Sequence, residues 1–72
     1  MNISQTLTYL DQQITSQKAS LKNSLFILSM AIEDDSGESV EETIQNYYNA
    51  QLISCKVKRC NKTGEYEIAI WW

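Results

Sequence analysis

The sequence predicts an α+β fold in the order α-α-β-β: a long amphipathic N-terminal helix, a short second helix and a C-terminal antiparallel β-hairpin. Three patterns predict it: helical spacing of apolar residues over the first 32 residues, a helix-start signal at residue 39, and two-residue alternation after residue 52. The 72 residues suffice for one small domain, residues 1–72, with a thin core.

The first helix is predicted from an apolar stripe that begins with Ile3, Leu7, Leu10 and Ile14. The stripe continues through residues 21, 25 and 28 to about Ile32, although the polar stretch 15–20 leaves two shorter helices as an alternative. One helix of thirty residues would be about 45 Å long, whereas a compact chain of this size is about 30 Å across. The overhanging part predicts a homodimer that packs through the first helix.

A turn at residues 34–37 is expected to end this helix, and a second helix starts soon afterwards. Ser39 and Glu42 have the spacing of a capping box, in which each residue satisfies a free backbone N–H of the helix start. Val40, Ile44 and Tyr47 form an apolar side, with Tyr48 as a further candidate, and the helix is expected to reach about Gln51.

The hairpin is predicted from alternating apolar residues on each side of a polar loop at residues 61–64. If Cys60 faces Glu65 across that loop, Val57 lies opposite Ile68 and Lys58 lies opposite Glu67. The same register thus places an apolar residue opposite an apolar one and a positive charge opposite a negative one. An isolated two-stranded hairpin is marginally stable, so its exposed edge is a second candidate interface for a homodimer.

The composition disfavours an enzyme, a metal site and a cofactor site. The chain has no histidine and only two glycines, which removes the commonest general base and any phosphate-binding glycine loop. Cys55 and Cys60 fall on opposite strand faces, too far apart for a disulfide, and two free thiols suit a cytoplasmic location. No apolar run approaches the roughly 18 residues that a membrane span needs.

The most unusual feature is the segment 31–42, which holds six of the nine carboxylates. These six are Glu33, Asp34, Asp35, Glu38, Glu41 and Glu42. The last three lie at the start of the second helix, where the helix dipole favours negative charge. The first three are expected at the C-terminal end of the first helix, where they cost stability. They form either a solubilising loop or a docking surface for a basic groove.

The alternation of the last strand sends Trp72 to the core and Trp71 to the surface, where an exposed tryptophan is a typical interface anchor. The predicted function is therefore a non-enzymatic protein–protein interaction module. In this interpretation, the six carboxylates and Trp71 dock a basic, nucleic-acid-binding surface of a protein partner. A tiny, acidic, histidine-free α+β chain resembles, as a class, the small inhibitors that phages and mobile elements encode, anti-CRISPR proteins among them.

Two alternatives to this function remain open. One is a small dimeric nucleic-acid-binding regulator that uses the basic hairpin residues Lys56, Lys58, Arg59 and Lys62. The net charge of −3 makes direct nucleic-acid binding a weaker prediction than docking to a protein. The other alternative is a structural subunit of a larger assembly.

Overall fold

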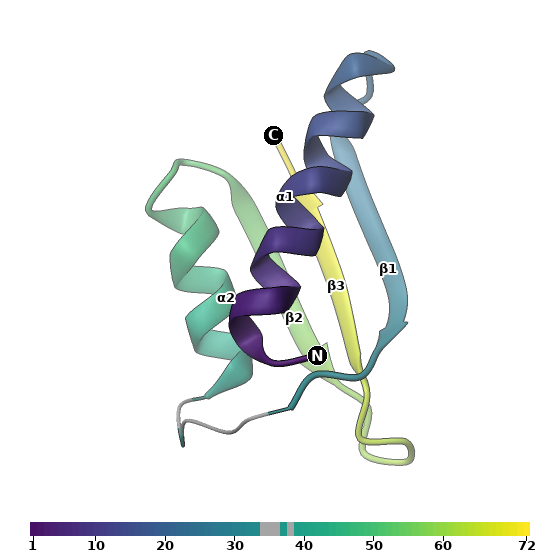
Figure 1. Ribbon diagram of the computed structural model, residues 1–72, viewed down its shortest axis with the longest axis vertical. Coiled ribbons are helices and arrows are strands. Elements are labelled where there is room, and N and C mark those ends of the chain that lie inside the picture. Colours follow the sequence, from purple (N-terminus) through teal and green to yellow (C-terminus); the bar gives the residue numbers. More distant parts are fainter. Residues whose placement is uncertain (34–36, 38) are drawn as a thin grey trace.

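The computed structural model describes residues 1–33, 37 and 39–72. Within these residues the chain forms α1 (Ile3–Ala19), β1 (Ser24–Met30), α2 (Val40–Asn49), β2 (Ser54–Arg59) and β3 (Tyr66–Trp71). The helices cover one face of an antiparallel sheet with strand order β1-β3-β2 (Figure 1). The α+β class is confirmed, with one more strand than the predicted hairpin.

The first helix is shorter than predicted, because a defined cap stops it. At its start, the Asn2 and Gln5 side chains each accept a hydrogen bond from the other's backbone N–H, at 2.8 and 3.0 Å. At its end, Leu21 takes a left-handed conformation with φ 60°. The Lys22 amide then donates to the Gln17 carbonyl at 2.9 Å, which closes the helix as a Schellman motif.

Residues predicted to continue the first helix form strand β1 instead. The spacing of seven that joined Leu21 and Leu28 to the helical stripe is coincidental, because these side chains are 95% and 77% exposed. Because α1 ends at Ala19, the overhang from which a homodimer through the first helix was predicted is not formed. The hairpin offers only β2 as a free edge, since β3 is paired on both sides.

The second helix starts where the sequence predicts and the hairpin has the predicted register, but α2 buries Tyr48 whereas Tyr47 is exposed. Of the predicted capping box, the structure shows the hydrogen bond to Ser39. The Ser39 hydroxyl caps α2 by accepting from the Glu42 amide at 3.3 Å. In the hairpin, Val57 pairs with Ile68 and Lys58 with Glu67, as predicted. The Cys60 amide donates to the Glu65 carbonyl at 2.8 Å, which fixes the four-residue loop.

The core lies between the helical layer and one face of the sheet. Leu10, Ile44, Tyr48, Ile68 and Ile70 are completely buried there, and burial of each such side chain contributes about 1.5–3 kcal/mol. Both helices lie on this side, and in the described part of the chain no helix covers the opposite face of the sheet (Figure 1). That uncovered face is central to the candidate sites below.

Candidate interaction surfaces

The acidic segment is described only in part, because Asp34, Asp35 and Glu38 lie outside the described residues. Glu33 and Glu42 are exposed, and Glu41 is half-buried. Glu41 and Glu42 occupy the first turn of α2, as predicted. These two carboxylates therefore stabilise the helix start through the helix dipole.

Glu33 does not lie at the C-terminal end of a helix, so the prediction that it costs stability there is wrong. Its amide donates to the Met1 carbonyl at 2.6 Å, and its backbone forms a parallel bridge with Asn2, the cap of α1. Both helices begin at this end of the molecule (Figure 1). Negative charge is favoured beside helix N-termini, which gives Glu33 a structural explanation that the sequence did not suggest.

Trp71 and the acidic residues belong to different surfaces. The neighbouring Ile70 is buried under the helices, so Trp71 points to the other side of the sheet, where it is 44% exposed. Trp71 also lies next to the C-terminus, at the opposite end of the sheet from the start of α2 (Figure 1). The site predicted from the sequence therefore divides into two separate regions.

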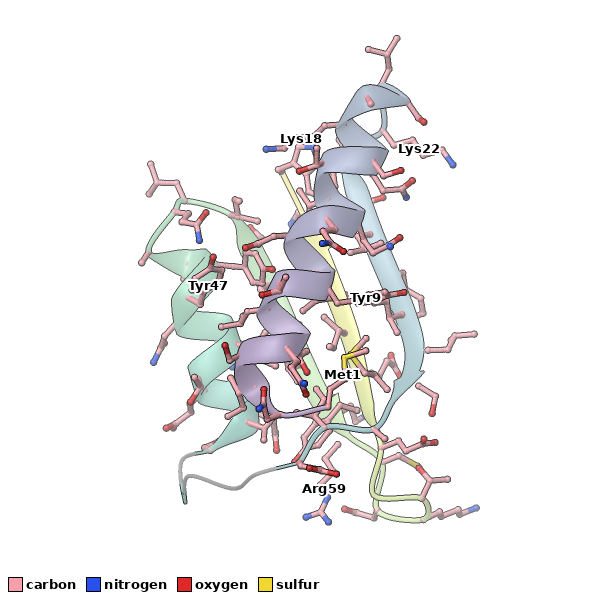
Figure 2. All side chains as sticks on the ribbon, viewed as in Figure 1. Met1, Tyr9, Lys18, Lys22, Tyr47 and Arg59 are labelled. Carbon is pink, nitrogen blue, oxygen red and sulfur yellow. The ribbon has the colours of Figure 1, made fainter. Side chains whose placement is uncertain are left out.

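Trp72 packs against the core, as the alternation predicts. Its amide donates to the Asn23 carbonyl at 3.0 Å. The Lys18 amine, at the far end of α1, lies 5.8 Å from the centroid of the Trp72 ring (Figure 2), within the range of a cation–π contact. Trp72 therefore holds the last strand to the end of the first helix, and Trp71 alone faces solvent.

The uncovered side of the sheet, here called the open sheet face, carries three large apolar side chains among polar ones. Phe26 is 56% exposed and Leu28 is 77% exposed, and both lie on β1. Phe26 pairs with Ala69, diagonal to Trp71 of β3, and Leu28 lies further along β1, next to Glu67 at the hairpin end. The open sheet face consists of Ser24, Phe26, Leu28, Ser54, Lys56, Lys58, Glu67, Ala69 and Trp71. A solvated face of an antiparallel sheet is normally polar, so these three exposed apolar side chains make the open sheet face a candidate binding surface.

Sequence reasoning missed Phe26 and Leu28 as surface residues because it placed them on a helix. The available signal was the uninterrupted apolar run from Leu25 to Leu28. Four consecutive apolar residues spread around a helix, whereas on a strand they supply both faces of a sheet. Leu25 and Ile27 indeed pack into the core, and Phe26 and Leu28 point out.

A hollow of about 320 Å³ lies at the hairpin end of the open sheet face. It is lined by Leu28, Ser29, Lys58, Arg59, Cys60, Thr63, Glu65 and Glu67. Arg59 lies at that end of the molecule (Figure 2). The Ser29 hydroxyl donates to the Glu65 carboxylate at 2.6 Å, which ties β1 to the hairpin loop. Charges of both signs line the hollow, so it favours neither an anion nor a cation.

The two cysteines have opposite environments and are both free. Burial raises the pKa of the Cys55 thiol to about 11, so the thiol is neutral and serves as a core residue. Hydrogen bonding to Thr63 lowers the pKa of the exposed Cys60 thiol. Cys55 lies within β2 and Cys60 directly follows the end of β2, and the two thiols are not joined by a disulfide.

A cluster of titratable groups joins the two helices. The Tyr48 hydroxyl donates to one Asp11 carboxylate oxygen and the Tyr47 hydroxyl donates to the other, each at 2.8 Å. Tyr47 projects from α2 toward α1 (Figure 2). The two tyrosine rings pack edge to face with centroids 4.9 Å apart. Each carboxylate oxygen is occupied by a phenol of the same chain, so the cluster holds α2 to α1.

In the residues that the structure describes, no group of three or more metal-ligating side chains is placed to hold an ion, and no helix has the length and apolarity to cross a membrane. No family model, no curated protein and no solved structure matches the chain.

Proposed function

We propose that the protein is a non-enzymatic protein–protein interaction module, acting as a small inhibitor or adaptor. The observation that carries this proposal is the exposure of Phe26, Leu28 and Trp71 together on one sheet face. Aromatic residues are enriched at the anchoring positions of protein interfaces. Exposed apolar side chains that gather on one face indicate a contact with another molecule.

The acidic end of the molecule is the part that we propose to dock a basic, nucleic-acid-binding surface of a protein partner. Glu33 and Glu42 are exposed there, and the structure gives neither side chain an ion pair within its described residues. Asp34, Asp35 and Glu38 add three more carboxylates to the same stretch of sequence. Such a concentration of one charge speeds and orients association with a basic partner.

Affinity capture of partner proteins by wild type and by two double variants tests this proposal. The double variant Glu33→Lys/Glu42→Lys changes the acidic end, and Phe26→Ser/Trp71→Ser changes the open sheet face. We expect wild type to capture a specific set of proteins, and at least one variant to lose it. Gln12→Lys/Thr15→Lys, which adds charge on exposed positions of α1, is the control and should retain the set. Equal capture by all four baits would refute the proposal.

A nucleic-acid-binding regulator is a second candidate, favoured by one observation on the open sheet face. Lys56 and Lys58 lie on β2, Trp71 lies on the neighbouring strand β3, and Phe26 lies beyond it on β1. Aromatic rings beside basic residues on a sheet are a common arrangement for binding single strands. Titration of the free protein with a single-stranded oligonucleotide at low and high salt separates the candidates, because this regulator would bind with strong salt dependence.

A further inference from the structure

The side chains of the open sheet face are complementary to a second copy of the same face. We infer that the protein forms a homodimer in which two open sheet faces pack together with their strands crossing at roughly 90°. This inference rests on the proposed function only for the premise that the open sheet face is a binding surface. It names a second copy of this chain as the occupant.

The strand registers fix the array of side chains. Ala69 of β3 lies between Phe26 of β1 and Lys56 of β2. Along β3, Trp71 and Glu67 lie two residues to either side of Ala69 and point to the same face. Neighbouring strands are about 4.8 Å apart, and same-face residues along one strand are about 6.8 Å apart. Ala69 is thus the centre of an array of four side chains, with Phe26 and Lys56 beside it across the strands and Trp71 and Glu67 beside it along β3.

Symmetric dimers with aligned strands place like charges together. A two-fold axis along β3 sets Glu67 against Glu67 of the second copy. A two-fold axis across the strands sets Lys56 against Lys56 of the second copy. Like charges facing each other across an interface cost several kcal/mol, so neither arrangement is favoured.

A two-fold axis along one diagonal of the array separates both of these like-charge pairs. The like-charge pair that remains, Lys58 against Lys58 of the second copy, lies at the rim of the contact, where two pairs of opposite charge offset it. This axis places the strands of the second copy across those of the first. Trp71 of one copy then meets Phe26 of the other, and Lys56 of one copy meets Glu67 of the other. Symmetry makes each contact twice. The paired positions are offset by about 2 Å, the difference between the two sheet spacings, which aromatic and long charged side chains accommodate. Ala69 lies on the axis, where its small side chain allows close approach of the sheets.

The other diagonal and the other occupants fit less well. The second diagonal would set the Phe26 ring against Glu67, which buries a carboxylate on an apolar group. A nucleic acid would place phosphates over a face that contains Glu67, on a chain of net charge −3. A second copy instead satisfies both the aromatic pair and the charge pair of this face.

Sedimentation equilibrium of charge variants tests the dimer. We expect wild type to dimerise at concentrations up to about 1 mM, because small interfaces are typically weak. Lys56→Glu and Glu67→Lys each place like charges together twice and should weaken dimerisation by about tenfold or more. An equimolar mixture of the two variants should form a heterodimer, since each altered position then faces an opposite charge. Lys62→Glu and Glu42→Lys are matched changes outside the face and should leave dimerisation unchanged.

A third variant reports on the axis itself. Lys58 lies on the chosen diagonal beyond Ala69, so its two copies approach each other at the rim, and Lys58→Ser should tighten the dimer. These positions are exposed, so the variants should fold, which circular dichroism confirms. A monomeric wild type, or single variants that dimerise as wild type does, would overturn the inference. If wild type is monomeric while Phe26→Ser/Trp71→Ser loses captured proteins, the dimer fails and the proposed function stands.

Discussion

At the scale of single residues, two leucines hold a backbone conformation that glycine usually adopts. Leu21 and Leu52 have φ of 60° and 63°, and each is 95% exposed. Leu21 lies just beyond the C-cap Ser20 of α1, and Leu52 lies two residues beyond the C-cap Ala50 of α2. In each case the left-handed turn lets the following amide reach back to the helix. The Ile53 amide donates to the Tyr48 carbonyl at 3.0 Å, which repeats at α2 the cap seen at α1. The leucine side chains gain almost no burial in return.

Replacing either leucine by glycine should therefore stabilise the fold. A side chain in the left-handed region costs about 1–2 kcal/mol, and the extra freedom of glycine in the unfolded chain offsets part of this. We expect Leu21→Gly and Leu52→Gly each to raise the free energy of unfolding by about 0.5–1 kcal/mol, measured by urea denaturation. Leu→Ala at the same positions keeps the Cβ atom and should give little gain. A loss of stability with glycine would show that the leucine side chain makes a stabilising contact.

At the scale of elements, the two helices are joined by hydrogen bonds whose strength depends on pH. Desolvation and the hydrogen bond to Asp11 raise the pKa of Tyr48 well above its usual value of 10.0. The hydrogen bond to Asp11 is the main cause of a raised pKa at Tyr47 as well. Both phenols thus bind their protons more tightly in the folded state than in the unfolded state.

Stability should consequently fall at alkaline pH. A raised folded-state pKa contributes stability that is complete below the unfolded-state pKa and is lost as the pH rises toward the folded-state value. Cys55 adds to the decline from about pH 9, since burial raises its pKa from 9.0 to about 11, and the tyrosines add from about pH 10. Urea unfolding between about pH 8 and pH 11 measures this decline.

Two tyrosine variants assign the decline to the helix contact. Tyr48→Phe removes the phenol that donates to Asp11, so its stability should fall less steeply above about pH 10. Tyr9→Phe, on α1 outside the cluster, should keep the wild-type slope. Equal slopes in all three proteins would show that the phenol of Tyr48 does not account for the alkaline loss.

At the scale of the whole molecule, β3 is the element that the others surround. It pairs with β1 on one side and β2 on the other, and Ile68 and Ile70 are completely buried under the helices. Backbone groups hydrogen-bonded within the centre of a sheet open only when much of the fold opens. The edge strands have one side free of backbone pairing.

Hydrogen exchange measured by NMR should therefore find the slowest amides in β3. The amides of Ile68 and Ile70 should exchange at rates set by global unfolding, and several positions of β1 and β2 should exchange faster. In the arrangement predicted from the sequence, with β1 absent, β3 would be an edge and would show alternating protection. That alternating pattern, or a β1 segment as protected as a helix interior, would contradict the observed topology.

Local sequence patterns predicted those parts of the fold that depend only on residues close together in the chain. The register that pairs Val57 with Ile68 follows from two alternating strands and a loop that only a hairpin satisfies. The start of α2 follows from Ser39, whose hydroxyl caps the helix wherever the helix lies. The same alternation places Trp71 on the surface without knowledge of the rest of the fold.

The segment 24–30 is different, because its local pattern fits both a helix and a strand. Its apolar residues match a helical stripe and also supply both faces of a strand. What decides is outside the segment: β3 has backbone donors and acceptors on a second edge that need partners, and β1 provides them. With β1 in the sheet, the acidic end moves beside the helix N-termini, and Phe26 joins Trp71 on one face.

The sequence by itself thus determined the class of the fold, the hairpin register, the second helix and the outward side of Trp71, since each depends on neighbours along the chain. Only the tertiary structure decided that Ser24–Met30 form a strand, which edge of β3 is paired, and which residues share the open sheet face. These depend on hydrogen bonds between segments more than forty residues apart, such as Leu25 and Ile70. No local periodicity records such a pairing, because a strand's periodicity is the same whichever partner it finds.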